Sequence, residues 1–233
     1  MPIVLTVDQQ RSRRGPDRVD DALHRLAQYP ATRGFERTAG DEFQGVFEHS
    51  GAAVDAVLDL VRDGHWSIGL GIGPVERPLP ASTRAGRGDA FVLARDAVTA
   101  AKRAPQHLAV RAGDPLAGAD AEAVLNLLAA LMRSRTPQAW QAIDLADPGR
   151  PQSEIAAKLG VTRQAIGQRL AAAHWREEQA ARPVVGRLLE RADRASALAA
   201  ETSRVVAATG VPDHVPDVLA GAEPTRSAPA RRS

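Results

Sequence analysis

One stretch of ten residues, W-S-I-G-L-G-I-G-P-V from Trp66 to Val75, restricts the fold more than any other. Glycine or serine alternates here with Ile68, Leu70 and Ile72, and this period of two predicts a β-strand. One face of the strand is apolar, while the other has almost no side chains. Such a bare face must lie close to another backbone or to a ligand. The stretch therefore predicts a strand with a closely packed neighbour.

The rest of the N-terminal half has strand and helix patterns in turn. Apolar runs predict strands at 2–7, 35–38, 43–47 and 108–111, and apolar residues at helical spacing predict helices at 17–28, 52–61 and 89–103. With the strand at 66–75, the order is β, α, β, β, α, β, α, β. This is the ferredoxin-like pattern with a small addition, an α+β fold in which helices cover one face of the sheet.

The character of the chain changes after Gly113. Residues 120–210 are rich in alanine and leucine, and we expect helices interrupted at Pro137, at 148–151 and at Pro183. The sequence thus predicts a ferredoxin-like domain at 1–113 and a helical domain at 119–208. The last residues, 211–233, contain prolines and few apolar side chains, so we expect a disordered tail there.

A helical hairpin is predicted at 152–170. Ile155, Ala156 and Leu159 form an apolar face, Gly160 allows a tight turn, and Thr162 is a suitable N-cap for the second helix. The second helix turns Ile166 and Leu170 inward. A plain hairpin of two packed helices would show the same apolar face and glycine turn.

The outward side chains of the second helix favour a more specific interpretation. They are of the types that hydrogen-bond base edges and phosphates in the major groove, and no acidic residue follows until Glu177. We therefore predict a helix-turn-helix that binds double-stranded DNA. The candidate DNA-binding residues are Thr162, Arg163, Gln164, Gln168 and Arg169.

Composition excludes several classes of site. The net charge of +2 is too small to indicate nucleic acid by itself, and the absence of cysteine excludes disulfides and thiolate metal sites. The six histidines show no metal-ligand spacing, and no serine sits in a nucleophile elbow. No run approaches the roughly 20 apolar residues that a membrane span needs. We expect a soluble, cytoplasmic protein with no membrane partner.

The stretch R-T-A-G-D-E-F, from Arg37 to Phe43, contains a turn that carries two adjacent carboxylates, Asp41 and Glu42. In a ferredoxin-like sheet the first strand lies beside the central hairpin, so Asp8 at the end of that strand can approach Asp41 at the hairpin tip. Carboxylate oxygens suit a hard cation such as Mg²⁺, and backbone N–H groups of the turn suit phosphate. The pair is also compatible with an ordinary polar turn that has no ligand.

These residues resemble known families. The stretch from Arg37 to Phe43 resembles the R-x-G-G-D-E-F hairpin of diguanylate cyclases, with Ala39 in place of the first glycine, and the stretch from Ala94 to Lys102 resembles the A-D-x-A-L-Y-x-A-K helix of the same domain. An early V-D-x-x-x-S-R, the A-G-D-E-F-Q hairpin and G-x-A-F-x-x-A-R together look like the SatD family. The hairpin at 152–170 is similar to the helix-turn-helix of sigma-factor region four.

The resemblance implies specific site residues. It gives Asp8 and Asp41 as metal ligands, Gly40, Asp41 and Lys102 as nucleotide contacts, and Mg²⁺ with a nucleotide as the cofactor. No catalytic residue is assigned, because Ala39 makes the cyclase-like site look degenerate. The expected protein is a DNA-binding transcriptional regulator, and not an enzyme, that senses a nucleotide through this domain.

Several alternatives remain open from the sequence. The chain can instead be an active nucleotide cyclase or nucleotidyltransferase tethered to DNA, or a ligand-free DNA binder that uses the first domain for dimerisation. Arg84 and Arg87 can contact phosphate or simply be solvated. An apolar stripe between Val184 and Ala199 can pair with a second subunit, giving a homodimer, or cover the first domain.

Overall fold

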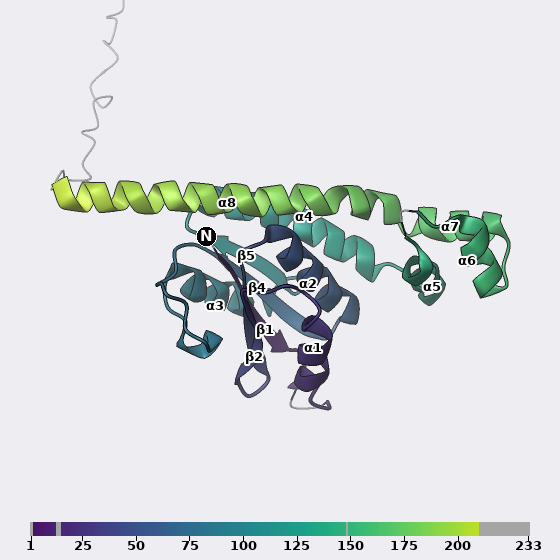
Figure 1. Ribbon diagram of the computed structural model, residues 1–233, viewed down its shortest axis with the longest axis horizontal. Helices are drawn as coiled ribbons and strands as arrows, with labels where there is room; N and C mark the ends of the chain where they lie inside the picture. The colour runs from purple at the N-terminus through teal and green to yellow at the C-terminus, as the bar shows by residue number, and fades with distance from the viewer. Residues whose placement is uncertain (1, 13–14, 148, 210–233) are drawn as a thin grey trace, which may run out of the picture.

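The computed structural model describes residues 2–12, 15–147 and 149–209, and the predicted tail at 211–233 lies outside them. It is an α+β protein in which a five-stranded mixed sheet is followed by a helical part (Figure 1). This confirms the predicted α+β class, with a sheet followed by helices. The elements are β1 (Ile3–Gln9), α1 (Val19–Leu26), β2 (Arg33–Ala39), β3 (Glu42–Phe47), α2 (Ser50–Asp63), β4 (Trp66–Ile72), the 3-10 helix η2 (Thr83–Ala85), α3 (Asp89–Ala101), β5 (Leu108–Ala112), α4 (Pro115–Arg133), α5 (Pro137–Leu145), α6 (Gln152–Leu159), α7 (Arg163–Ala172) and α8 (Trp175–Thr209).

The strands are ordered β2-β3-β1-β4-β5 across the sheet. The pairs β2–β3, β3–β1 and β1–β4 are antiparallel, whereas β4 and β5 are parallel and are joined through α3. A parallel pair needs such a crossover connection, because its strands start at the same edge of the sheet. The strand β5 is therefore the addition that the sequence pattern predicted.

The glycines of β4 lie against helix α3, as the alternation in the sequence predicted. A Cβ atom added to Gly71 would lie 2.1 Å from the carbonyl oxygen of Ala90, and one added to Gly69 would lie 2.2 Å from the backbone nitrogen of Val98. Any side chain at these positions would push the helix off the sheet. The neighbour of the bare face is thus another backbone rather than a ligand.

Helices cover both faces of the sheet, so the prediction that they cover one face is wrong. Helix α3 packs on the glycine face, where Val4 and Val46 meet Ala94. Helices α1 and α2 pack on the opposite face, around Leu5 and Leu70. The reason is that β1 is apolar on both faces, and a two-sided apolar strand must be covered twice.

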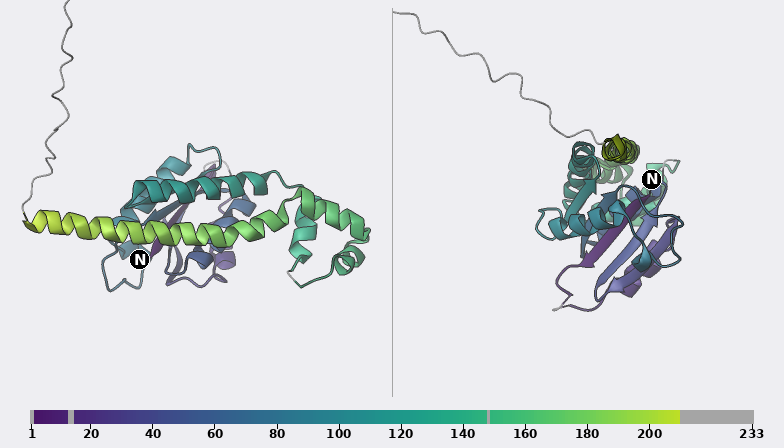
Figure 2. Two further views of the ribbon diagram at one scale, coloured as in Figure 1. Left: turned by 90° about the horizontal axis from the view of Figure 1, so that it is seen from above. Right: turned by 90° about the vertical axis from the view of Figure 1, so that its left-hand side faces the viewer.

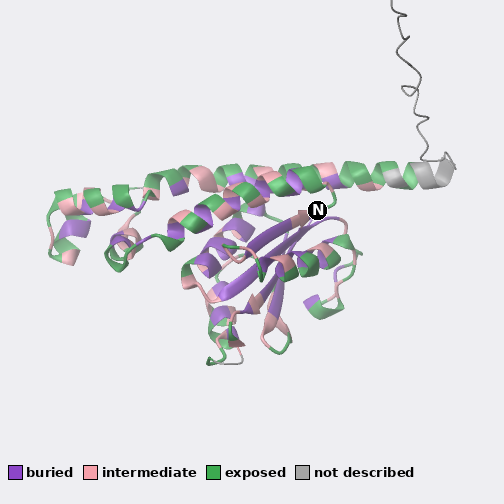
Figure 3. Cartoon of the chain, turned by 180° about the vertical axis from the view of Figure 1, so that it is seen from behind, coloured by how far each residue is buried: buried purple, intermediate pink, exposed green. Residues whose placement is uncertain are grey.

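The long helix α8 crosses the whole molecule beside α4 (Figures 1 and 2). Leu125 of α4 and Val185 and Leu189 of α8 are fully buried in the same hydrophobic core as the sheet. The inward side of the predicted apolar stripe therefore packs on the core that includes the sheet, while Leu198 stays 66% exposed. Buried and exposed segments alternate along α8 (Figure 3).

The expected interruption at Pro183 is wrong, because α8 continues through this proline. A proline inside a helix removes one backbone hydrogen bond. Here the surrounding turns are held by tertiary packing: Val185 and Leu189 are in the core, and Arg182 bonds Glu178 one turn earlier. Packing of this kind outweighs a local helix-breaking preference.

By length and composition alone, one described helix, α4, is apolar enough to cross a membrane, although the sequence analysis expected no such segment. Its residues Ala121, Leu125 and Ala129 are fully buried against the sheet and α8. One side of α4 thus belongs to the core, while Leu116 and Leu127 are exposed.

Candidate functional site

Helices α6 and α7 form the predicted helical hairpin at one end of the molecule, away from the sheet (Figure 1). Gly160 between them has φ +64°, a left-handed conformation that glycine adopts without strain. The Thr162 hydroxyl accepts a hydrogen bond from the Ala165 backbone N–H at 3.1 Å, which caps α7. Ile155 and Ile166 are buried between the helices. The local structure is as the sequence predicted.

The predicted DNA-binding positions lie on the outer side of α7. Thr162, Arg163, Gln164 and Gln168 are exposed, and Arg169 is half-buried. Within the described residues, neither arginine forms an ion pair or donates a side-chain hydrogen bond. Free guanidinium and amide groups on one helix face can donate to phosphates and to base edges.

The tip of the β2–β3 hairpin lies beside the end of β1, as predicted. Gly40 has φ +58° at the tip, and its carbonyl accepts a hydrogen bond from Arg37 at 2.8 Å. The Gln9 backbone N–H donates to the Asp41 carbonyl at 3.2 Å. Asp8 lies directly opposite Glu42 in the antiparallel pair, so these two carboxylates share one face of the sheet.

Asp8 is paired with Lys102, the residue predicted to contact phosphate. The Lys102 Nζ lies 2.7 Å from the Asp8 Oδ2. Burial raises the pKa of Asp8 above its ordinary value, Lys102 acts in the opposite direction, and Asp41 and Glu42 raise it further. The lysine thus relieves repulsion among neighbouring carboxylates.

The site formed by Asp8 at the end of β1 and Asp41 at the hairpin tip fits a metal ion only in part. Among the described residues no group of three or more His, Asp or Glu side chains could hold a metal ion. Asp8 and Asp41 together offer a hard cation two protein carboxylates, which is enough for Mg²⁺ only when substrate oxygens and water complete its shell. The assignment of a metal to Asp8 and Asp41 stays a prediction.

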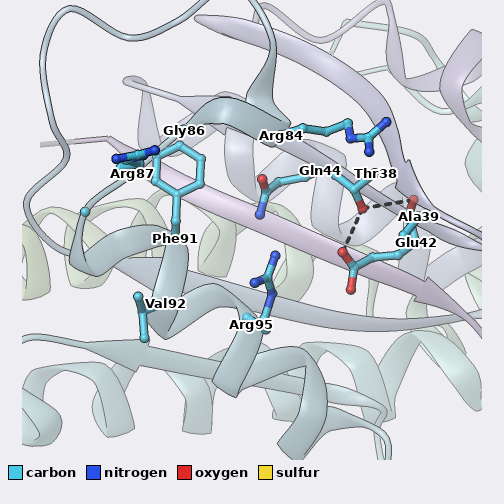
Figure 4. Close-up of a pocket in the computed structure, with 11 residues that line it drawn as sticks. Thr38, Ala39, Glu42, Gln44, Arg84, Gly86, Arg87, Phe91, Val92 and Arg95 are labelled. Atoms are coloured by element: carbon cyan, nitrogen blue, oxygen red, sulfur yellow. Dashed lines mark hydrogen bonds between the residues drawn. The ribbon is translucent and has the colours of Figure 1, made fainter.

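A cavity of about 450 Å³ opens next to the hairpin, between β2, β3, the loop before α3 and α3 itself (Figure 4). Gly40, Asp41 and Lys102 are not among its lining residues. The cavity is lined by Thr38, Ala39, Glu42, Gln44, Arg84, Gly86, Arg87, Gly88, Phe91, Val92 and Arg95.

The loop that carries Arg84 is tied to β2 by Glu36. One carboxylate oxygen of Glu36 accepts hydrogen bonds from the Ser82 hydroxyl, the Thr83 hydroxyl at 2.9 Å and the Arg84 backbone N–H at 2.9 Å. Burial acts to raise the pKa of Glu36, but these hydrogen bonds outweigh it and lower the pKa below the ordinary value. Arg33 adds bonds to two carbonyls of the same loop.

Glycine allows the loop to close over α3. A Cβ atom added to Gly86 would lie 2.1 Å from the Phe91 ring. Gly88 has φ +114° and packs against the backbone of Val75. The loop backbone is therefore fixed by contacts on both sides, and with it the points from which the exposed Arg84 and Arg87 side chains project.

Several residues that line the cavity have no role predicted from the sequence. Phe91 and Arg95 are four residues apart in the motif G-x-A-F-x-x-A-R, a spacing that places both on one face of a helix. Gln44 lies two residues after Glu42, so both point to the same side of β3. Periodicity thus predicts which residues share a face of α3 and which share a face of β3. It does not predict that this helix and this strand line the same cavity.

No family model, curated protein or solved structure matches this chain. The resemblances to the SatD family, to diguanylate cyclases and to sigma-factor region four therefore stay predictions.

Proposed function

We propose that this chain is a transcriptional regulator that binds double-stranded DNA through α6 and α7. The observation that carries the proposal is the outer face of α7, where Arg163, Gln164 and Gln168 are exposed. No acidic residue occurs between 155 and 176 to repel a phosphate backbone. Thr162, at the helix start, is placed to donate its hydroxyl to phosphate or to a base.

The position of α6 and α7 in the molecule supports the same proposal. They stand at the end of the long axis, clear of the sheet (Figure 1). The arrangement leaves α7 free to enter a major groove without a collision of the sheet with the duplex. Exposed apolar residues of α4 and α8, Leu127 and Leu198, offer a surface for the proposed homodimer. Light scattering across a concentration series tests that state.

In the proposed function the first domain senses a nucleotide and is degenerate as a cyclase. The order β1-α1-β2-β3-α2-β4 with strands arranged β2-β3-β1-β4 supports a ferredoxin-like, cyclase-like assignment. The ion pair between Asp8 and Lys102 supports a binding role over chemistry, because it occupies a predicted metal ligand. Product formation from nucleoside triphosphate and Mg²⁺, lost in Asp8→Ala, would favour the enzyme instead.

The DNA proposal is tested by fluorescence anisotropy with labelled duplex selected from a random library. The variant Arg163→Ala/Arg169→Ala removes two charges from α7. The matched control Arg187→Ala/Arg194→Ala removes two charges from the exposed side of α8. We expect the first variant to bind the duplex more weakly and to lower the salt slope by about 1.8, since each phosphate contact contributes about 0.9.

Two results would contradict the proposal. Equal weakening by both double variants would mean that binding depends on overall charge alone. Failure of the selection to enrich any sequence would mean that α7 reads no bases. The third interpretation, a ligand-free DNA binder, requires that no nucleotide changes the affinity for the enriched duplex.

A further inference from the structure

We propose that the cavity between the β2–β3 hairpin and α3 binds a phosphorylated organic anion the size of a mononucleotide. The inference rests on the proposed sensing function and changes its location: the ligand contacts are Arg84, Arg87 and Arg95 rather than Gly40, Asp41 and Lys102. The residues that carry it are those drawn in Figure 4.

Charge is the first argument. Three arginines and one carboxylate, Glu42, line the cavity. Arg84 and Arg95 approach from opposite sides, with Gln44 between them (Figure 4). Within the described residues, none of the three guanidinium groups forms an ion pair or donates a hydrogen bond, and Glu42 is itself bonded to the Thr38 hydroxyl at 2.7 Å. The cavity thus holds excess positive charge that an anion would neutralise.

The placement of these charges is the second argument. Arg84 follows the residues that Glu36 anchors, and Arg95 projects from the middle of α3, a helix packed directly on the glycines of β4. The backbone positions of Arg84 and Arg95 are therefore fixed before a ligand arrives. Their side chains are exposed, and within the described residues no protein partner would have to be displaced by a phosphate. The planar fork of guanidinium matches phosphate oxygens in pairs, which makes arginine better suited to phosphate than a mobile point charge.

The remaining wall indicates the organic part of the ligand. Phe91 lines the cavity beside Gly86, and Val92 at the same wall is 62% exposed. Phe91 is itself only 8% exposed, so Val92 provides most of the apolar surface that a ligand would cover at this wall. Across from it, Thr38, Glu42 and Gln44 offer groups that bond hydroxyl or amino substituents. A volume of about 450 Å³ lies in the range of small-molecule sites.

The test uses isothermal titration calorimetry on the full chain with ATP, AMP and pyrophosphate. Adenosine and citrate serve as the uncharged and the non-phosphate comparison. The variant is Arg84→Gln/Arg95→Gln. The control, Arg103→Gln/Arg194→Gln, removes two exposed arginines that do not line the cavity. Thermal melting of both unliganded variants checks that they fold, and we expect no loss of stability from relieving repulsion between like charges.

We expect ATP or AMP to bind the wild type and the control, and the dissociation constant to rise at least about tenfold in Arg84→Gln/Arg95→Gln. Absence of binding by every phosphorylated probe would overturn the proposal. Citrate binding as tightly as pyrophosphate would overturn the phosphate assignment. If Lys102→Gln abolished binding and Arg84→Gln/Arg95→Gln kept it, the ligand would bind at the site predicted from the sequence, beside Asp8, Asp41 and Lys102, and not in this cavity.

The two proposals fail separately. Arg84→Gln/Arg95→Gln should bind duplex DNA as the wild type does when no ligand is added, since the substitutions lie outside α6 and α7. Nucleotide binding by a wild type that does not bind DNA would overturn the function proposed above and leave this site standing. DNA binding by a wild type that binds no phosphorylated probe would overturn this site and leave the DNA-binding function standing.

Discussion

Arg135 and Glu178 form a buried ion pair at the end of the molecule where α5, α6 and α7 lie, and it connects this end to α8. The Arg135 Nη2 lies 2.6 Å from the Glu178 Oε2, and the two side chains are 1% and 2% exposed. Arg135 also donates its Nε to the Ala173 carbonyl at the end of α7, and it lies 4.8 Å from the Trp140 ring of α5. Glu178 additionally pairs with Arg182 at 2.5 Å.

The two ends of this pair should respond unequally to substitution. Glu178→Leu leaves the buried Arg135 without a carboxylate, which typically costs about 3–5 kcal/mol of the free energy of unfolding. Arg135→Met costs less, about 1.5–3 kcal/mol for the lost hydrogen bond from the charged Arg135 Nε to the Ala173 carbonyl, because Glu178 keeps Arg182. The double substitution removes both buried charges, and it should therefore be less destabilising than Glu178→Leu alone.

Chemical denaturation followed by circular dichroism and tryptophan fluorescence measures these differences. At about 2–4 °C per kcal/mol for a chain of this size, Glu178→Leu should lower the melting temperature by about 6–20 °C. A loss of under about 1 kcal/mol in Glu178→Leu would refute the reasoning. So would a double substitution whose cost equals the sum of the single costs, because the cycle would then show no coupling.

Three further predictions concern the sheet domain. Gly71→Ala should lower the free energy of unfolding by about 3 kcal/mol or more, because the added Cβ would meet the Ala90 carbonyl. The control Gly51→Ala has open space around the added Cβ and should not destabilise the protein, and denaturant unfolding curves compare the two variants. Tyr29 is the only tyrosine, and burial with a nearby carboxylate raises its pKa to about 12. Tyrosinate absorbance should therefore stay low at about pH 11. The stability that Tyr29 contributes should be complete below the ordinary pKa of 10.0 and be lost as pH rises from there through about 12; an absorbance midpoint near 10.0 would contradict this. Because the folded pKa of Glu36 is lowered from 4.5, Glu36→Gln should lower the melting temperature at neutral pH, and the difference from wild type should disappear as pH falls through the folded pKa; a difference that persists in acid would refute it.

Local chemistry explains why much of the chain could be predicted. The turn at Gly160, the cap at Thr162 and the inward Ile166 follow from conformational preference and helical period, which act within a few residues. The bare face of β4 required a close neighbour for the same reason. These features need no information from distant segments, so the sequence predicted them with their residue numbers.

Interactions between distant segments explain what the sequence analysis missed. Lys102 lies 94 positions from Asp8, and only the packing of α3 on β1 makes them an ion pair. The apolar stripe of α8 was compatible with a partner subunit or with the sheet, because an apolar face does not specify what covers it.

The amino-acid sequence by itself determined the strands, the helices before α8 and the inward face of the helical hairpin at 152–170. The continuation of α8 through Pro183 came from tertiary packing. Only the tertiary structure decided that α3 lies on the glycine face, that α8 packs on α4 and α2, and that Arg84 and Arg95 line one cavity. The physical reason is range: backbone preference and periodicity act along a few residues, whereas burial and charge pairing depend on which distant segments come together in space.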